Sequence, residues 1–254
     1  FVAQVMADVE RLSAEDEPYH RELITYEAPY LDNLPTAPRE KFAANIAAIQ
    51  KLKEIEQRVA NGGSPAFEDE QKILAQYTGW GGLSDAFDPN KSAWSNEYSQ
   101  LKAALSESEY EAARSSTLTA FYTPATVIHP IYRALERFGV KGGKILEPSM
   151  GTGAFLAHGH FGSSDATFYG VELDSITGRI SKQLYQKANI QVTGYENALL
   201  PDNYFDCVIG NVPFGNFQVN DPQYNRLHFP IHDYFFAKSI DKLRTGGIMA
   251  FITS

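Results

Sequence analysis

Residues 211–214, Asn-Val-Pro-Phe, are the part of the sequence whose residue types most directly suggest chemistry. The amino nitrogen of a planar base is a poor nucleophile because its lone pair is delocalised into the ring. Two acceptors aimed at its hydrogens favour a more tetrahedral nitrogen and free that lone pair for a methyl donor. We expect the Asn211 side-chain oxygen and the Val212 carbonyl to be these acceptors, with Pro213 keeping both aimed. Phe214 offers a face for the base, worth about 1–3 kcal/mol. The alternative is a turn that ends a buried strand.

A second group of residues points to a nucleoside-containing cofactor. Gly151 and Gly153 allow a tight turn and close backbone approach to a ligand, although a purely structural turn would need them too. Glu172 follows Gly153 by 19 residues and ends an apolar segment, where its carboxylate can accept hydrogen bonds from both ribose hydroxyls. Leu156 replaces the third glycine of the dinucleotide pattern, and Glu147 would repel a pyrophosphate but attract a sulfonium and an ammonium group. These details favour S-adenosylmethionine over a dinucleotide.

Thr123 and Pro124 begin an apolar, helix-like segment at residues 123–139. Thr123 is a suitable N-cap and Pro124 suits the first helical position. The amino end of this helix could hold the carboxylate of the cofactor. The alternative is that these two residues only start a helix.

The elements that must position these residues alternate between strand and helix after residue 121. Short apolar or β-branched segments predict strands, and longer segments between them predict helices. This order indicates βαβ units and a doubly wound, mainly parallel sheet, which binds ligands at the carboxyl ends of its strands. The expected strands are 144–147, 166–173, 189–194, 205–210 and 248–253, and the expected helices are 123–139, 174–188 and 232–247.

Residues 36–120 carry helical signals instead. Residues 36–63 have a Pro near the start, Asn-Gly-Gly at the end and one apolar stripe. Ser64 is the expected cap of the next helix, with Pro65 in its first turn, and Ser106 and Glu109 have the spacing of a capping box. We expect these helices to cap the sheet. The stripe consists of Phe42, Ile46, Ile49, Leu52, Ile55 and Val59, and a further helix is expected within 94–105.

Composition narrows the class of protein. The 254 residues are 43% hydrophobic and 21% charged, as in ordinary globular proteins, and they contain no apolar run long enough to span a membrane. The formal charge is −9, from 31 acids and 22 bases, which argues against a free-standing nucleic-acid binder. The first residues lack the pattern of a signal peptide and suggest a piece of a longer chain. Cys207 is the single cysteine, lies in an apolar run, and is expected in the core.

The segments FYTP, LEPSMGTGAF, VELD, FDCVIGNVPFG and GGIMAFITS, in this order, resemble the N6-adenine DNA methyltransferases whose TP segment precedes the glycine motif. They span residues 121–254, and the segment after 211 further resembles the methylase part of large methylase–helicase proteins of phages and conjugative elements. The resemblance implies methyl transfer from S-adenosylmethionine to N6 of an adenine flipped out of DNA. Its implied cofactor-binding residues are Tyr122, Thr123, Pro124, Glu147, Ser149, Gly151, Gly153, Phe155, Glu172 and Glu196, with Asn197 as an alternative to the last.

The chain is expected to divide into three parts. Charge and periodicity predict a weakly structured acidic arm at 1–35 and a helical region at 36–120, and the resemblance implies a C-terminally truncated methyltransferase domain at 121–254. DNA is the implied partner, bound with help from regions outside this sequence such as a target-recognition or helicase part, in a bacterial or phage-encoded cytoplasmic protein without metal or membrane. The family tetrad is Asn-Pro-Pro-Tyr, so Val212 and Phe214 depart from it. Two alternatives stay open: a protein glutamine methyltransferase, and a non-catalytic interaction or antirestriction module that keeps the cofactor fold.

Overall fold

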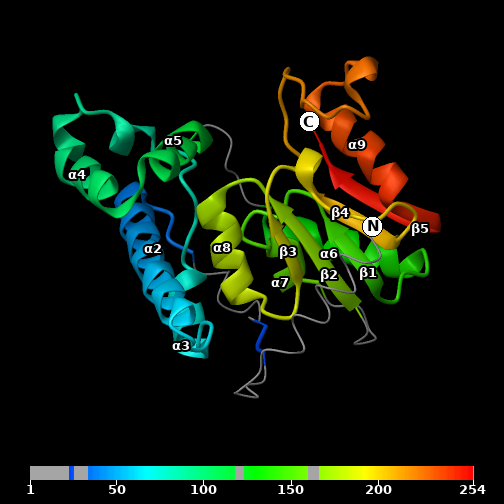
Figure 1. Cartoon of the computed structure of the whole chain (residues 1–254), viewed down its shortest axis with the longest axis horizontal. Helices are drawn as coiled ribbons and strands as arrows, with labels where there is room; N and C mark the ends of the chain where they lie inside the picture. Colours follow the sequence, from blue (N-terminus) through cyan, green and yellow to red (C-terminus); the bar gives the residue numbers. More distant parts are fainter. Residues whose placement is uncertain (1–22, 26–33, 118–122, 160–165, 254) are drawn as a thin grey trace.

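The computed structural model describes residues 23–25, 34–117, 123–159 and 166–253. Its centre is a sheet of five strands in the order β3-β2-β1-β4-β5, in which every neighbouring pair is parallel (Figure 1). This confirms the predicted doubly wound α/β fold. The strands are β1 (Gly143–Glu147), β2 (Ala166–Glu172), β3 (Asn189–Val192), β4 (Phe205–Asn211) and β5 (Leu243–Ile252).

The chain changes direction across the sheet between β1 and β4. From β1 it adds β2 and β3 on one side, whereas β4 and β5 extend the other side. The crevice at such a reversal, outside the carboxyl ends of the strands, is where open parallel sheets bind ligands. Glu147 ends β1 and Asn211 ends β4, so two of the predicted site residues flank this crevice.

β5 differs from its prediction because it starts at Leu243 rather than at residue 248. Phe205 pairs with Leu243 and Cys207 pairs with Ile248, so the strand carries extra residues opposite a short stretch of β4. Gly246 has a φ of 78° within this irregularity, and the Arg244 side chain donates to Asp206 at 2.5 Å. The expected helix over 232–247 therefore ends at Lys242.

Helices cover both faces of the sheet. Alternate residues of a strand point to opposite faces, so Ile145 and Leu146 mark the two faces of β1. Helix α6 (Ala125–Arg137) packs in the cluster that contains Ile145, whereas α9 (Ile231–Lys242) packs in the cluster that contains Leu146. The two remaining helices of this half are α7 (Ala154–Ala157) and α8 (Ser175–Leu184), and short 3₁₀ turns occur at η4 (Tyr195–Asn197) and η5 (Asn225–Leu227).

Cys207 lies in the core on the α6 side of the sheet, as predicted. Its side chain is fully buried among apolar residues, including Ile128 and Ile145. Burial raises the pKa of its thiol to about 12. A thiol in these surroundings stays protonated and serves packing.

The helices before residue 118 form a layer against α8. Trp80 is the centre of its core, with its ring at 5.3 Å from that of Phe87 and 6.2 Å from that of Phe42. The same apolar cluster continues into Ile176 and Ile180 of α8. These helices therefore reach the sheet chiefly through α8 rather than by packing on the strands. Their bounds are α2 (Pro38–Ala60), α3 (Glu68–Leu74), η2 (Ser84–Phe87), η3 (Ser92–Trp94), α4 (Ser95–Ala104) and α5 (Glu107–Ser116).

Two local predictions in this layer are wrong. Val59, expected in the apolar stripe of α2, is 41% exposed, although the other five members of the stripe are buried. The second helix begins at Glu68 and not near Ser64, because the Glu70 carboxylate accepts from the Phe67 N–H at 2.9 Å and so fixes the first turn there. The capping box of Ser106 and Glu109 is confirmed, with both reciprocal hydrogen bonds present.

The acidic arm lies mostly outside the described residues. The short piece that the structure describes docks on the end of α8. Thr25 forms an antiparallel bridge with Tyr185, and the Gln186 N–H donates to the Ile24 carbonyl at 3.3 Å.

A charged contact ties the helical layer to α8. The Arg179 guanidinium donates to both Glu56 oxygens at 2.6 Å and to Glu109 at 2.7 Å. Burial acts to raise the pKa of Glu109, but hydrogen bonds from Arg179, Ser106 and Lys53 outweigh it and lower the pKa to about 2. The three charged side chains are 11–34% exposed, so their attraction is only partly screened by solvent.

Replacing Arg179 with Met should destabilise the fold by about 1–3 kcal/mol, because Glu56 loses its guanidinium partner and Glu109 keeps only the contacts from Lys53 and Ser106. Urea denaturation measures the change. The matched control is Arg114→Met: Arg114 lies 4.0 Å from Glu111, both side chains are more than 60% exposed, and such a pair contributes little. Equal effects of the two substitutions would show that the Arg179 contact does not stabilise the fold.

Two features are absent from the described part of the chain. No helix there is long and apolar enough to cross a membrane. No group of three or more His, Cys, Asp or Glu side chains in the same residues is arranged to hold a metal ion.

Candidate functional site

The site lies where β1, β2 and β4 end. Glu147, Glu172 and Asn211 are the last residues of these three strands. Because the strands are parallel and adjacent, their carboxyl ends form one edge of the sheet. Residues far apart in sequence thus reach one crevice, as their positions at predicted strand ends indicated.

The glycine loop after β1 adopts a conformation that favours glycine. Gly151 has a φ of 55° and Gly153 a φ of 79°. The Gly151 N–H donates to a Glu172 carboxylate oxygen at 2.8 Å, which joins the ends of β1 and β2. A Cβ at Gly153 would lie 2.3 Å from a ring carbon of Tyr185, so this position is closed to any side chain.

Helix α8 holds this loop from behind. The Ser181 hydroxyl donates to the Gly151 carbonyl at 2.9 Å, and the Tyr185 hydroxyl donates to the Thr152 carbonyl at 3.0 Å. Both side chains are almost completely buried. Neither of these supporting residues was predicted from the sequence. The only indication of such a role there is Ser181, a serine on the apolar face of a predicted helix. They fix the loop carbonyls without facing the crevice.

Two neighbouring carboxylates, those of Glu147 and Glu172, determine the electrostatics at these strand ends. Glu147 is 2% exposed, and its Oε2 is buried with no hydrogen-bond partner among the described residues. Burial, together with the nearby charge of Glu172, raises the pKa of Glu147 well above its ordinary value. Burial also raises the pKa of Glu172 to about 7, although Asp174 and Gly151 N–H groups donate to it at 2.7 and 2.8 Å. Two neighbouring acids, one buried and one half-buried, favour a cationic ligand.

The raised pKa of Glu172 predicts a pH dependence. The folded protein holds this proton more tightly than the unfolded chain, so the group's contribution to stability falls as pH rises from about 4.5 to about 7 and is constant above. A cation that needs the ionised carboxylate must displace the proton. Its affinity should fall below pH 7, by up to about tenfold per pH unit for one linked proton.

Calorimetry of S-adenosylmethionine binding at pH 6, in buffers of different ionisation enthalpy, measures this linkage. We expect net proton release at pH 6, and the share of it that comes from Glu172 should disappear near pH 8. Proton uptake, or an affinity that does not change between pH 6 and pH 8, would contradict the assignment of a titrating carboxylate to the site.

The Asn211 loop is held on both sides. The Ser149 hydroxyl donates to the Asn211 backbone carbonyl at 2.9 Å, and the Val212 N–H donates to the Ile252 carbonyl of β5 at 3.2 Å. Val212 is 1% exposed, so its side chain anchors the loop in the core. The Asn211 Oδ1 is buried and has no hydrogen-bond partner in the part of the chain that the structure describes. A buried acceptor without a donor is costly to keep, which points to a ligand that supplies the donor.

Exposed apolar side chains follow the strand ends that carry the buried polar atoms. Pro213 is half-buried, and Phe214 is 43% exposed. Leu173, directly after Glu172, is 75% exposed, and Phe217 is 55% exposed. Neither Leu173 nor Phe217 was predicted as a site residue, since an apolar residue beside a strand or turn is usually buried. The segments at the ends of β2 and β4 therefore combine buried polar atoms with exposed apolar side chains.

The segment before α6 corrects one prediction. Pro124, with ψ of 152°, is the N-cap, and helix α6 begins at Ala125, so Thr123 precedes the cap and does not provide it. Because α6 ends at Arg137 and β1 starts at Gly143, the helix runs opposite to β1. Its amino end thus lies at the edge where the strands end, and its first N–H groups are available to an anion. Tyr122, the neighbouring predicted site residue, lies outside the described residues.

Phe155 does not face the crevice. Its ring is 1% exposed and packs in the core cluster with Ile128 and Ile145, while its carbonyl accepts from the Tyr132 hydroxyl at 2.8 Å. The ring is thus directed into the core between α6 and β1 and is part of its packing. The prediction of Phe155 as a cofactor contact is therefore corrected to a role in supporting the glycine loop.

Glu196 lies in η4, which follows the carboxyl end of β3, and its backbone carbonyl accepts from Lys238 of α9 at 3.2 Å. Its half-buried carboxylate folds back over Gly194, where an added Cβ would lie 2.1 Å from Oε1, and it accepts from the Asn197 side chain at 2.9 Å. Asn197 itself is exposed. Of the two alternatives left by the sequence, Glu196 is the more enclosed.

Comparisons with known proteins agree with this arrangement. The model of a family described as N-6 DNA Methylase matches residues 107–252. The chain is 28% identical over 219 residues to Defense against restriction protein B of Escherichia phage P1, covering 84% of this chain and 8% of that protein. It is 31% identical over 137 residues to Modification methylase CviBIII of Paramecium bursaria Chlorella virus NC1A, covering 52% of this chain and 36% of that protein. The chain thus spans only a part of either relative.

Solved structures with a similar arrangement include two methylases. One is a putative S-adenosyl-L-methionine-dependent methyltransferase from Methanococcus maripaludis, with a TM-score of 0.36, 19% identity, and coverage of 50% of this chain and 57% of that chain. The other is an rRNA methylase from Streptococcus thermophilus, with a TM-score of 0.35, 18% identity, and coverage of 52% and 71%.

Proposed function

The chain belongs to the N-6 DNA methylase family, and from this premise we propose that it transfers a methyl group from S-adenosylmethionine to the N6 amino group of an adenine in DNA. The observation that carries the proposal is a pair of buried oxygens, Asn211 Oδ1 and Glu147 Oε2, that receive no donor from the described residues and lie at the ends of adjacent strands. The amino group of the adenine can donate to Asn211 Oδ1, and the ammonium group of the cofactor can donate to Glu147 Oε2.

The residues at the ends of β1 and β2 fit the cofactor. Glu172 is placed to accept from the two ribose hydroxyls, since it ends β2 beside the glycine loop. Glu147 supplies the negative charge that an ammonium and a sulfonium require. Leu173 offers an exposed apolar face for a purine, and the amino end of α6 can receive a carboxylate. Ser149, Gly151 and Gly153 shape the loop between them.

The Asn211 loop provides the activation of the substrate. Asn211 Oδ1 accepts one N6 hydrogen, and the Val212 carbonyl accepts the other, so the nitrogen lone pair turns out of the ring. Ser149 and Ile252 fix the loop from opposite sides, and Pro213 restricts it further, which makes the acceptors preorganised. When bound, S-adenosylmethionine supplies an activated methyl group on a sulfonium. Phe214 supports the base by stacking.

DNA is the proposed partner, with the adenine turned out of the duplex, because a stacked base cannot bring its amino group to the end of β4. We also propose that residues 121–254 form the catalytic domain, that 36–120 form its helical region, and that Glu196 contacts the cofactor.

The direct test is transfer of labelled methyl from S-adenosylmethionine to DNA by the full-length protein, followed by digestion to nucleosides. Label in N6-methyl-2′-deoxyadenosine supports the proposal. Label in cytosine or in protein glutamine would contradict adenine methylation. The absence of label from DNA, in a protein that binds the cofactor, would contradict it as well.

A further inference from the structure

The loop between β4 and α9, residues 212–230, carries more exposed apolar surface than the proposed chemistry uses. Phe214 is 43% exposed, Phe217 55% and Leu227 48%. Phe214 is assigned to the adenine, but Phe217 has no role in the proposed function. An exposed aromatic ring close to a site is commonly part of a binding surface.

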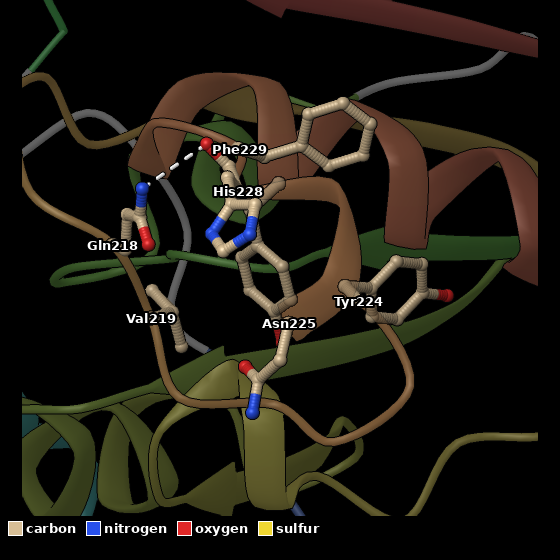
Figure 2. Close-up of a pocket in the computed structure, with 7 residues that line it drawn as sticks. Gln218, Val219, Tyr224, Asn225, His228 and Phe229 are labelled. Carbon is tan, nitrogen blue, oxygen red and sulfur yellow. Dashed lines mark hydrogen bonds between the residues drawn. The ribbon is translucent and has the colours of Figure 1, made fainter.

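Phe217 is held in place at the surface. Gly215 has a φ of 151°, and a Cβ there would lie 2.6 Å from the Phe217 ring, so the ring packs closely against this bend. The Phe217 carbonyl accepts from the Ile231 N–H at 2.9 Å. Figure 2 shows the next contact, in which the Gln218 side chain donates to the His228 carbonyl at 3.2 Å. These two hydrogen bonds link residues 217–218, near the start of the loop, to His228 and Ile231 at its end.

A buried ion pair fixes the middle of the same loop on α9. Asp221 is 6% exposed and accepts from the Lys238 ammonium at 2.9 Å and from the Tyr234 hydroxyl at 2.8 Å. Its other oxygen accepts from the Gln223 N–H at 3.1 Å. These hydrogen bonds fix the middle of the loop against α9.

The charge of this loop differs from that of the chain. The protein has 31 acids and 22 bases, yet residues 212–230 contain a single acid, Asp221, which is buried against Lys238. The exposed charged or titratable side chains of the loop are Arg226 and His228. A polyanion can approach this surface without repulsion from the loop itself. The surface is continuous with Phe214, which the proposed function already places against DNA.

We propose that Phe217 inserts into double-stranded DNA next to the target adenine and fills the space that the base leaves when it turns into the site. This inference rests on the proposed function. A flipped base leaves its neighbours without a stacking partner, and an apolar ring in the gap restores part of the lost stacking. Phe217 follows Phe214 by three residues across a tight bend, so one ring contacts the flipped base while the other contacts the duplex. Arg226 contacts the flanking phosphates.

The test compares two duplexes that differ only at the target. In one, the adenine is paired with thymine, and in the other it lies in an internal loop of unpaired bases, so that no pairing and no ordered duplex stack must be broken. Phe217→Ala should lower methylation of the paired duplex by about 5- to 150-fold, the equivalent of one aromatic–base stack. Methylation of the second duplex should change by less than about twofold, since unpaired bases are extruded cheaply.

A parallel readout is the fluorescence of 2-aminopurine at the target position of the paired duplex, which rises when the base is unstacked. The variant should lose most of this rise while it binds S-adenosylmethionine normally. Phe138→Ala is the matched control, because Phe138 is 74% exposed at the end of α6 remote from the site, and it should leave both duplexes unaffected.

The outcomes separate this inference from the proposed function. Wild-type protein that methylates neither duplex overturns both. Wild-type protein that methylates both, with a Phe217→Ala variant that loses the two activities equally or retains both, overturns the insertion role alone. A surface that served another protein instead of DNA would give this last result.

Discussion

Asn211→Ala is expected to lower kcat for DNA methylation by about 10²–10³-fold, the usual loss when one preorganised hydrogen-bonding group aimed at the reacting atoms is removed. The Asn211 Oδ1 is buried and makes no hydrogen bond to the residues that the structure describes, so its removal breaks none of the described hydrogen bonds of the fold. Its removal should leave S-adenosylmethionine binding within about twofold, because the proposed cofactor contacts lie at the ends of β1 and β2.

The measurement is a single-turnover assay with labelled cofactor, which reports the methyl-transfer step. Asn216→Ala is a matched control on the same loop, since Asn216 is exposed five residues further on. A variant at Asn211 that keeps more than a tenth of the wild-type rate would remove the amide from the proposed chemistry. Loss of cofactor binding in the same variant would indicate collapse of the loop instead.

Glu172→Gln is expected to weaken S-adenosylmethionine binding on the order of 100-fold, since it replaces charge-assisted hydrogen bonds of about 1.5–3 kcal/mol each. The carboxylate has acceptor capacity beyond the Gly151 and Asp174 N–H groups that it already receives. The amide of Gln keeps one acceptor oxygen but presents N–H groups where the ribose hydroxyls would donate. The fold should survive, because one of the two backbone contacts remains.

Calorimetry measures the change in affinity, and thermal unfolding without cofactor checks the fold. Glu68→Gln, at a side chain that is 77% exposed on α3, controls for loss of one negative charge. If both substitutions weaken binding equally, the effect is one of net charge, and Glu172 is not a direct contact.

The strand ends could be predicted from the sequence because their signals are local. Each of Glu147, Glu172 and Asn211 follows a short apolar segment, and a parallel sheet brings such ends together whatever the details of packing. The buried Cys207 followed from the same reasoning.

The remaining parts depend on contacts between distant residues. Tyr185 closes the space beside Gly153 from 32 positions away, and no local pattern marks it. β5 starts early because Leu243 pairs with Phe205, which overrides the Thr-Gly-Gly that looks like the end of a helix. Phe155 looked like a ligand contact from the motif around it, but the burial of its ring depends on α6 packing over the sheet.

Helix α8 contacts both the glycine loop and the helical layer, so a change in one of these parts can affect the other. One side of it holds the glycine loop through Ser181 and Tyr185, and the other side receives the helical layer through Arg179 and the shared apolar cluster. Trimming the chain to residues 121–254 would therefore strip a large apolar face and loosen the support of the cofactor loop at once. Because α8 contacts both parts, we expect substitutions in the helical layer to change cofactor affinity as well as stability.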